Sequence, residues 1–134
     1  MNDEPTHDRD VPDAASLLTS AREALLADVM PSLDASSRYT ALMIANALAI
    51  AARDIALGPD ALRQEVERLR PLATESVAPS DPDTVDVHVL RRIVAAAIRA
   101  GRFDDAPHAQ SLVTALTRIA EDRLAISNPR ALRE

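Results

Sequence analysis

The stretch that decides the fold runs from Tyr39 to Gly58 and reads YTALMIANALAIAARDIALG. Alanine has the highest intrinsic helix propensity, and large apolar residues are interspersed with it along the stretch. Tyr39, Asn46 and Arg53 recur every seven residues, and seven residues fall only about 20° short of two full turns, so these side chains share one side of a helix. We therefore predict a long apolar helix, with one polar stripe, as the central helix of an all-α protein.

The composition extends this prediction to the whole chain. A chain of 134 residues fits one ordinary domain. Tyr39 and Phe103 are its only aromatic residues, so the core has to be built from Leu, Ile, Val, Met and Ala, and Gly58 and Gly101 are the only glycines available to interrupt helices. The sequence predicts a single-domain helical bundle of about five helices.

The missing residue types exclude several kinds of chemistry. The chain contains no lysine, cysteine or tryptophan, which rules out Schiff-base formation, thiolate nucleophiles, thiolate metal sites, disulfides and the lysine of a phosphate-binding loop. No catalytic triad or metal-ligand spacing is present. We expect a protein that is not an enzyme and that binds no cofactor or metal.

The charge and hydropathy pattern limit the partners and the location. A net charge of -6 argues against nucleic acid and anionic membrane surfaces. The longest apolar run, Ala41 to Ala52, has about 12 residues, fewer than the roughly 20 needed to span a bilayer. The first residues lack the apolar segment of a secretory signal, so we expect a cytoplasmic protein.

Caps and prolines set the expected boundaries of the helices. A disordered tail is expected over residues 1–11, a flexible loop over 73–82 and a C-terminal tail over 131–134, leaving 12–130 as the helical domain. The expected helices run from Asp13 as N-cap to about Pro31, from Asp34–Ser37 to Leu57 with Gly58 as C-cap, from Pro59 to Pro71, from about Asp83 to Ala100 with Gly101 as C-cap, and from about Pro107 to Ile126. The fourth is expected to bury Val85, Val89, Ile93 and Ala96.

The central helix carries its large apolar side chains in two sectors. One sector contains Leu42, Met43, Ile50 and Leu57, and the other contains Ile44, Leu48 and Ile55. Two apolar sectors indicate that the helix has neighbours on two sides.

The first candidate site is the stripe of Tyr39, Asn46 and Arg53. A buried asparagine must find hydrogen-bond partners, since an unsatisfied amide would cost a few kcal/mol. We favour a structural role, in which Asn46 fixes the register of neighbouring helices, as single asparagines do in coiled coils. The alternative is that the stripe forms the polar wall of a ligand pocket, with Arg53 as the anchor for an anion.

The second candidate site is the basic face of the fourth expected helix, made of Arg91, Arg92 and Arg99 with Arg102 nearby. Arginine suits the bidentate binding of carboxylates and phosphates, and such a face also suits docking to an acidic surface. The simpler interpretation is the solvated side of an ordinary amphipathic helix. The nearby acids and His88 match metal ligands in residue type alone; they are Asp81, Asp83 and Asp86, and they also suit the start of a helix.

Four segments together resemble a bacterial family of short helical proteins of unknown function. They are PDAASLLTSAREAL from Pro12, ANALAIAARDIALGP from Ala45, IRAGRFDD from Ile98 and RLAISNPR from Arg123. The positions most characteristic of this family correspond here to Asn46, Arg53, Gly58, Pro59, Gly101, Asn128, Pro129 and Arg130. One departure stands out, because Leu42 occupies a position where the family usually has arginine.

The resemblance implies a context for the function. Genes of this family lie beside genes for acyl-CoA dehydrogenases and for kinases similar to aminoglycoside phosphotransferases. We therefore expect a helical accessory protein that partners one of these enzymes in acyl-CoA metabolism. Two alternatives stay open: a small-molecule binding protein or enzyme that holds an acyl or CoA-like anion in a pocket beside the central helix, and a homodimer joined through that helix.

Overall fold

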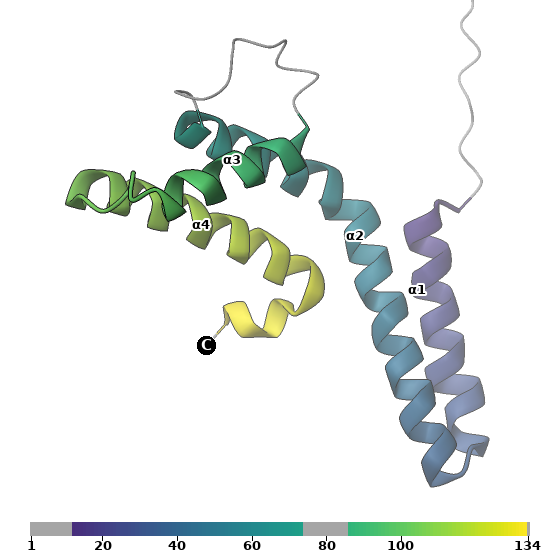
Figure 1. Cartoon of the computed structure of the whole chain (residues 1–134). Helices are drawn as coiled ribbons and strands as arrows, with labels where there is room; N and C mark the ends of the chain where they lie inside the picture. The colour runs from purple at the N-terminus through teal and green to yellow at the C-terminus, as the bar shows by residue number, and fades with distance from the viewer. Residues whose placement is uncertain (1–11, 74–85, 134) are drawn as a thin grey trace, which may run out of the picture. The chain divides into compact units, whose positions relative to one another are not determined.

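The computed structural model of the protein describes residues 12–73 and 86–133 (Figure 1). Every regular element in these ranges is helical, which confirms the all-α prediction, and there are four α-helices where about five were expected. The elements are α1 (Ala14–Ala24), the π-helical turn η1 (Leu25–Val29), the 3-10 turn η2 (Met30–Ser32), α2 (Ala35–Ala73), α3 (Val87–Arg99), α4 (Ala106–Ser127) and the 3-10 turn η4 (Pro129–Leu132). The tail expected over 1–11 and most of the loop expected over 73–82 lie outside the described residues.

The predicted break at Gly58 and Pro59 is wrong, because α2 continues through both residues to Ala73. Gly58 does not take the left-handed conformation of a C-cap, which Gly101 alone adopts among the described residues. Pro59 has no N–H to donate to the carbonyl of Ile55, a loss that costs about 3 kcal/mol in a helix interior. The many good helix formers on either side offset this cost, so the second and third expected helices are one.

Aspartate side chains begin the helices. The predicted N-cap Asp13 is confirmed, since its Oδ1 accepts from the Ser16 backbone N–H at 2.8 Å. Asp34 accepts from the N–H groups of Ser36 and Ser37 at 2.9 and 3.0 Å, and these bonds, that of Ser37 first, lower the pKa of its carboxyl. α3 begins later than predicted, because its N-cap is Asp86 and not Asp83. Each cap satisfies backbone donors that have no partner inside the helix.

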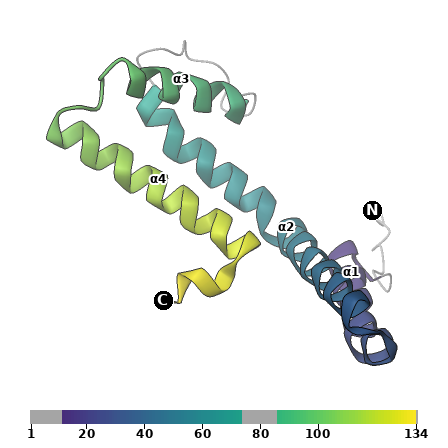
Figure 2. The same cartoon turned by 60° about the horizontal axis from the view of Figure 1, so that its bottom comes forward.

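The described residues fall into two units, divided within α2 between Ala56 and Leu57. The first unit, which we call the hairpin, contains α1, the turns η1 and η2, and the first part of α2. The two helices run antiparallel and side by side in both views (Figures 1 and 2). Among its described residues the buried ones are Ala41 and Ala45, one turn apart on α2, so this described part has no core of large side chains.

The second unit, which we call the three-helix unit, contains the last part of α2 with α3 and α4. Its core joins buried residues from all three helices: Leu69, Ala73, Val87, Leu90, Val94 and Ile119. The buried side of α3 differs from the prediction by about one residue, since Val87, Leu90, Val94 and Ala97 are buried while Val89 and Ala96 are exposed. Ile93 is partly buried against the core, and the predicted Val85 lies outside the described residues. Apolar residues occur on both sides of α3. The side that is buried is the one that contacts α2 and α4.

Gly101 ends α3 as predicted. Its φ of 74° lies in the left-handed region, and a Cβ at this position would come within 2.8 Å of the Asp104 Oδ2. The glycine therefore lets the chain turn sharply between α3 and α4.

Candidate functional sites

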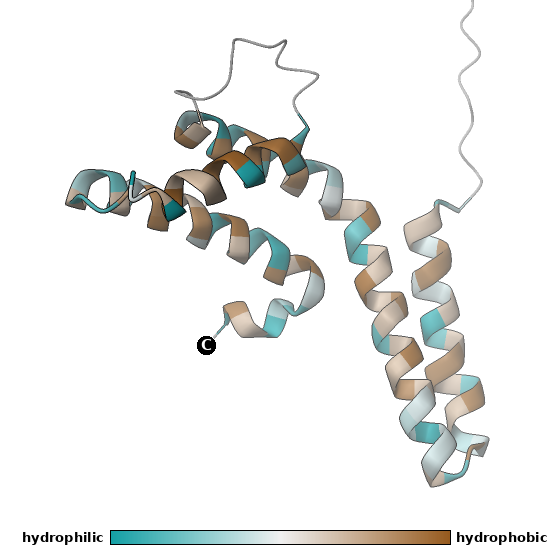
Figure 3. Ribbon diagram, in the orientation of Figure 1, coloured by the Kyte–Doolittle hydropathy of each residue, from teal (hydrophilic) through white to brown (hydrophobic). Residues whose placement is uncertain are grey.

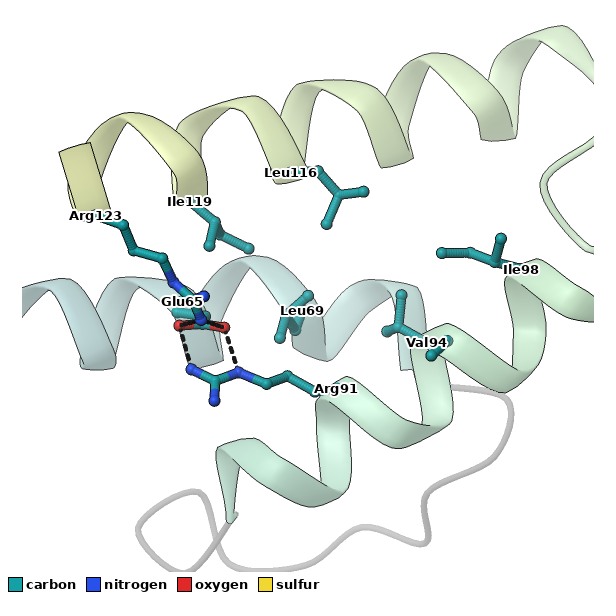
Figure 4. A pocket seen from close by; sticks show the side chains of 9 residues that line it. Glu65, Leu69, Arg91, Val94, Ile98, Leu116, Ile119 and Arg123 are labelled. Carbon is teal, nitrogen blue, oxygen red and sulfur yellow. Dashed lines mark hydrogen bonds and ion pairs between the residues drawn. The ribbon is translucent and has the colours of Figure 1, made fainter. Parts of the chain in front are cut away.

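A buried carboxylate joins the three helices of the three-helix unit. Glu65 on α2 is 6% exposed, and Arg91 on α3 donates to it from Nε and Nη2 at 2.7 and 2.8 Å. Arg123 on α4 donates from its Nη2 to both carboxylate oxygens at 3.0 Å (Figure 4). We call these three residues the Glu65 cluster.

Two members of the Glu65 cluster, Glu65 and Arg91, have shifted pKa values. The hydrogen bond from Arg91, followed by the bond and charge of Arg123, lowers the pKa of the Glu65 carboxyl despite its burial. The bond to Glu65 raises the pKa of Arg91. The cluster carries one negative and two positive charges, so its net charge is about +1.

An apolar groove of about 260 Å³ begins at the Glu65 cluster. Its other lining side chains are Leu69, Val94, Ala95, Ile98, Leu116 and Ile119. Figure 4 shows these side chains converging from α2, α3 and α4, with Arg91 and Arg123 at one end. The groove thus combines an apolar floor with a positive end.

A second groove, of about 410 Å³, lies between α2 and α4 in the same unit. Its two arginines are both paired with acids, Arg68 with Asp122 and Arg118 with Glu121. Its charge is therefore balanced, and it offers less attraction to an anion than the first groove.

The predicted stripe lies on the hairpin, on the side of α2 away from the buried Ala41 and Ala45. Tyr39 is 68% exposed, Asn46 is exposed and Arg53 is half-buried. The buried environment that we expected for Asn46 is not found within the hairpin. The role of the stripe, structural or ligand-binding, stays a prediction.

The four arginines of the predicted basic face belong to the three-helix unit and separate into two groups. Arg91 is bound to Glu65, whereas Arg92 and Arg99 are exposed and, being seven residues apart, share another side of α3. Arg102 is exposed beyond the end of α3. A docking role for Arg92, Arg99 and Arg102 stays a prediction.

Sequence reasoning missed Glu65. The signal was present, because Glu65 precedes Leu69 by one turn and adjoins Val66 on the apolar stripe of α2. An acid within such a stripe indicates a buried charge that needs a basic partner.

The hairpin exposes large apolar side chains on two faces of α2, and the ribbon of this part of α2 is coloured as hydrophobic at several places in Figure 3. We call the first face the seam; it contains Tyr39, Leu42, Met43, Asn46, Ile50 and Arg53. We call the second the isoleucine face; it contains Ile44, Leu48 and Ile55. At 100° per residue, Asn46 and Ile44 point about 160° apart. Leu42 is 51% exposed and Ile44 is 48% exposed, so each face presents apolar surface to its surroundings.

By length and composition alone, α2 is the one helix of the described residues that could cross a membrane. Only 11% of its most apolar window is buried within the structure. A core helix of a water-soluble protein can be as long and as apolar, so these properties of α2 are weak evidence for a membrane span.

Neither the hairpin nor the three-helix unit shows a metal site, since no group of three or more His, Asp or Glu side chains in the described parts of the chain is placed to hold an ion. Of the acids near His88, Asp86 caps α3, while Asp81 and Asp83 lie outside the described residues. The described residues are thus all-helical in their regular elements, and they include a hairpin with exposed apolar side chains.

The comparisons with known proteins place the chain in a family. It belongs to the family described as "Domain of unknown function (DUF6285)", whose model matches residues 31–131. The match covers all of α2, α3 and α4, and it leaves α1 outside. No curated protein and no solved structure matches the chain. Membership of a family of unknown function agrees with the resemblance in the sequence, and the expectation about neighbouring genes stays a prediction.

Proposed function

We propose that this protein is a non-enzymatic, cytoplasmic accessory protein that docks onto another protein through the isoleucine face of its hairpin. The observation that carries the proposal is the exposure of Ile44 and Ile55, each about half exposed on a helix with few buried neighbours. Removing apolar surface from water contributes about 25 cal/mol per Å², so covering this face favours association.

A protein surface suits the hairpin better than a bilayer. The uncharged stretch from Tyr39 to Ala52, between Arg38 and Arg53, has about 14 residues and a length of about 21 Å. The hydrocarbon core of a bilayer is about 30 Å thick. A helix that crossed it would place charged arginine side chains in hydrocarbon, whereas a protein partner can cover the apolar part without placing either arginine in hydrocarbon.

We propose an acyl-CoA dehydrogenase or a phosphotransferase-like kinase as the partner, following the gene context implied by the resemblance. In this arrangement the three-helix unit is the stable part of the accessory protein and the hairpin is the part that binds the enzyme. The exposed Arg92 and Arg99 are a further contact for an acidic enzyme surface.

The experiment is co-purification of the tagged full chain with each candidate enzyme from the same host. We expect one enzyme to be retained, and we expect Ile44→Asp to abolish retention because a charge on the isoleucine face would be buried without a partner. Leu42→Asp is the matched control, two residues away, equally exposed and on the seam. Retention of neither enzyme, or equal retention by Ile44→Asp, would contradict the proposal.

A second candidate function is the binding of an acyl or CoA-like anion, and the groove at the Glu65 cluster favours it. Arg123, 55% exposed, lies at the positive end of this groove. A volume of about 260 Å³ is just below the roughly 300 Å³ of the smallest drug-sized pockets, which suits a short apolar carboxylate.

Calorimetric titration with octanoate tests this second function, with octanol as the uncharged control. We expect octanoate to bind and octanol to bind at least tenfold more weakly. Arg123→Gln should remove the difference between them. Equal binding of the two compounds, or binding unaffected by Arg123→Gln, would argue against an anion site.

A further inference from the structure

The seam of α2 contains the polar stripe that neither function explains. The stripe is symmetric in position, with Tyr39 seven residues before Asn46 and Arg53 seven residues after it. We propose that two copies of the chain pair antiparallel through their seams, with the twofold axis beside Asn46.

The antiparallel arrangement matches unlike groups at the ends of the stripe. Around a twofold axis at Asn46, a residue before Asn46 lies opposite the residue equally far after it in the second copy. Tyr39 of each copy therefore meets Arg53 of the other. A guanidinium over an aromatic ring is a favourable contact, and symmetry forms it twice. Parallel pairing would instead place Tyr39 beside Tyr39 and Arg53 beside Arg53, so neither of these contacts between unlike groups would form.

The axis gives Asn46 a partner of the right chemistry. Its side-chain amide both donates and accepts, so two Asn46 amides at the axis can each donate to the carbonyl oxygen of the other. The amide that is exposed in one copy becomes hydrogen-bonded in the pair. A single asparagine in an apolar seam also fixes register, because any slip leaves two buried amides without partners.

The apolar residues of the seam are complementary in the same register. Met43, three residues before the axis, lies next to Ile50 of the second copy, four residues after it, and both lie on one edge of the seam. On the other edge Leu42 lies next to Ala49 of the second copy. The large residues thus meet apolar neighbours and no charge.

The exposed area is enough for a dimer of moderate stability. Tyr39, Leu42 and Met43 are each at least half exposed, and at roughly 200 Å² per large side chain they expose on the order of 350 Å² per copy. A standard interface takes about 800 Å² from each partner. Asn46, Ile50 and Arg53 supply further area, and the total stays below this standard size, so the interface is that of a weak dimer. We expect dissociation at micromolar concentrations.

This pairing is independent of the proposed function, since it covers the seam and leaves the isoleucine face open. A dimer that retains no enzyme would overturn the proposed function and leave the pairing intact. A monomer that retains an enzyme would overturn the pairing and leave the proposed function intact.

Sedimentation of the full chain over a hundredfold range of concentration tests the pairing. We expect the mass to rise from 14.4 kDa toward twice that value. Leu42→Asp should weaken association at least tenfold, whereas Ile44→Asp should leave it unchanged. Both positions are exposed in the single chain, and equal circular dichroism of the two variants controls for folding. A wild-type chain that is monomeric at every concentration overturns the proposal. This holds also where the cause is that another part of the same chain covers the seam. So does loss of the dimer in Ile44→Asp alone.

Cysteine crosslinking tests the orientation, because the chain has no cysteine of its own. With a short bismaleimide, Asn46→Cys should crosslink to itself in high yield. Tyr39→Cys should crosslink poorly alone and well when mixed with Arg53→Cys, since equal residues in these positions lie about 21 Å apart along an antiparallel pair. Efficient crosslinking of Tyr39→Cys alone would show parallel helices and contradict the proposed axis.

Discussion

The three-helix unit and the hairpin use similar residue types in opposite ways. The three-helix unit buries Leu90 to 1% exposure and binds Glu65 to arginines from two other helices. The described part of the hairpin fully buries two alanines and leaves Leu42, Met43 and Ile44 about half exposed. A core of large side chains stabilises a unit by itself, whereas exposed large side chains are stabilised by what covers them. This difference in burial indicates that the three-helix unit determines folding and that the hairpin determines association.

Leu90→Ala should have the largest effect on stability. Leu90 is the most buried large side chain among the described residues, and truncating such a leucine costs about 2 to 5 kcal/mol through lost burial and the cavity left behind. Denaturant unfolding of the full chain would measure the loss. A loss below about 1 kcal/mol would show that the unit is less well packed than its burial indicates.

Glu65→Ala should have the next largest effect and lower the free energy of unfolding by about 2 kcal/mol. Removing one partner of a fully buried pair costs about 3 to 5 kcal/mol, and the exposure of Arg123 reduces this value. Thermal unfolding of Glu65→Ala and Glu65→Gln would measure this loss, with Glu67→Ala as a control at an exposed acid two residues away on the same helix. Equal stability of Glu65→Ala and Glu67→Ala would contradict the structural role of the cluster.

The same residue predicts a pH dependence. The folded pKa of Glu65 is lowered, so its contribution to stability is present above the ordinary glutamate pKa of about 4.3 and is lost as the pH falls through the lowered folded value. We expect the difference in stability between wild type and Glu65→Gln to shrink as the pH falls from 6 to 3, the range about that pKa. A difference that grows on acidification would have the wrong sign.

Gly101→Ala should lower the free energy of unfolding by about 1 kcal/mol. An alanine at a φ of 74° is strained, and its Cβ would press on the Asp104 side chain. Comparison with Gly58→Ala sharpens the point, since Gly58 lies in the interior of α2 without a positive φ and alanine there should stabilise the helix. Chemical unfolding of both variants would show opposite signs, and equal signs would mean that the two glycines were assigned wrongly.

Leu42→Ala should have the smallest effect on the folding of the single chain, within about 0.5 kcal/mol, because Leu42 is exposed there. Unfolding at a concentration below association would measure it beside Leu90→Ala. A loss as large as that of Leu90→Ala would mean that Leu42 is buried within the single chain.

The sequence predicted the elements better than their packing. Asp13 and Gly101 follow from local chemistry, because a cap needs only its own side chain or its own φ. Pro59 misled the prediction, since the stability of a continuous α2 depends on residues on both sides of the proline. The buried side of α3 depends on contacts with α2 and α4 that no local pattern contains.

The candidate sites show the same division. The seven-residue spacing of Tyr39, Asn46 and Arg53 is a property of one helix and was visible in the sequence. The Glu65 cluster joins residues 26 and 58 positions apart and needed coordinates. Asn46 was expected to be buried within the chain, and its exposure in the hairpin redirects the question to a second molecule.

Hydrogen–deuterium exchange of the full chain at low and high concentration tests the contrast between the two units most directly. We expect exchange in α3 and α4 to be slow and independent of concentration, and exchange around Asn46 to slow as the concentration rises. Exchange around Asn46 that is as slow as in α3 at every concentration would contradict the claim that the hairpin is stabilised by association.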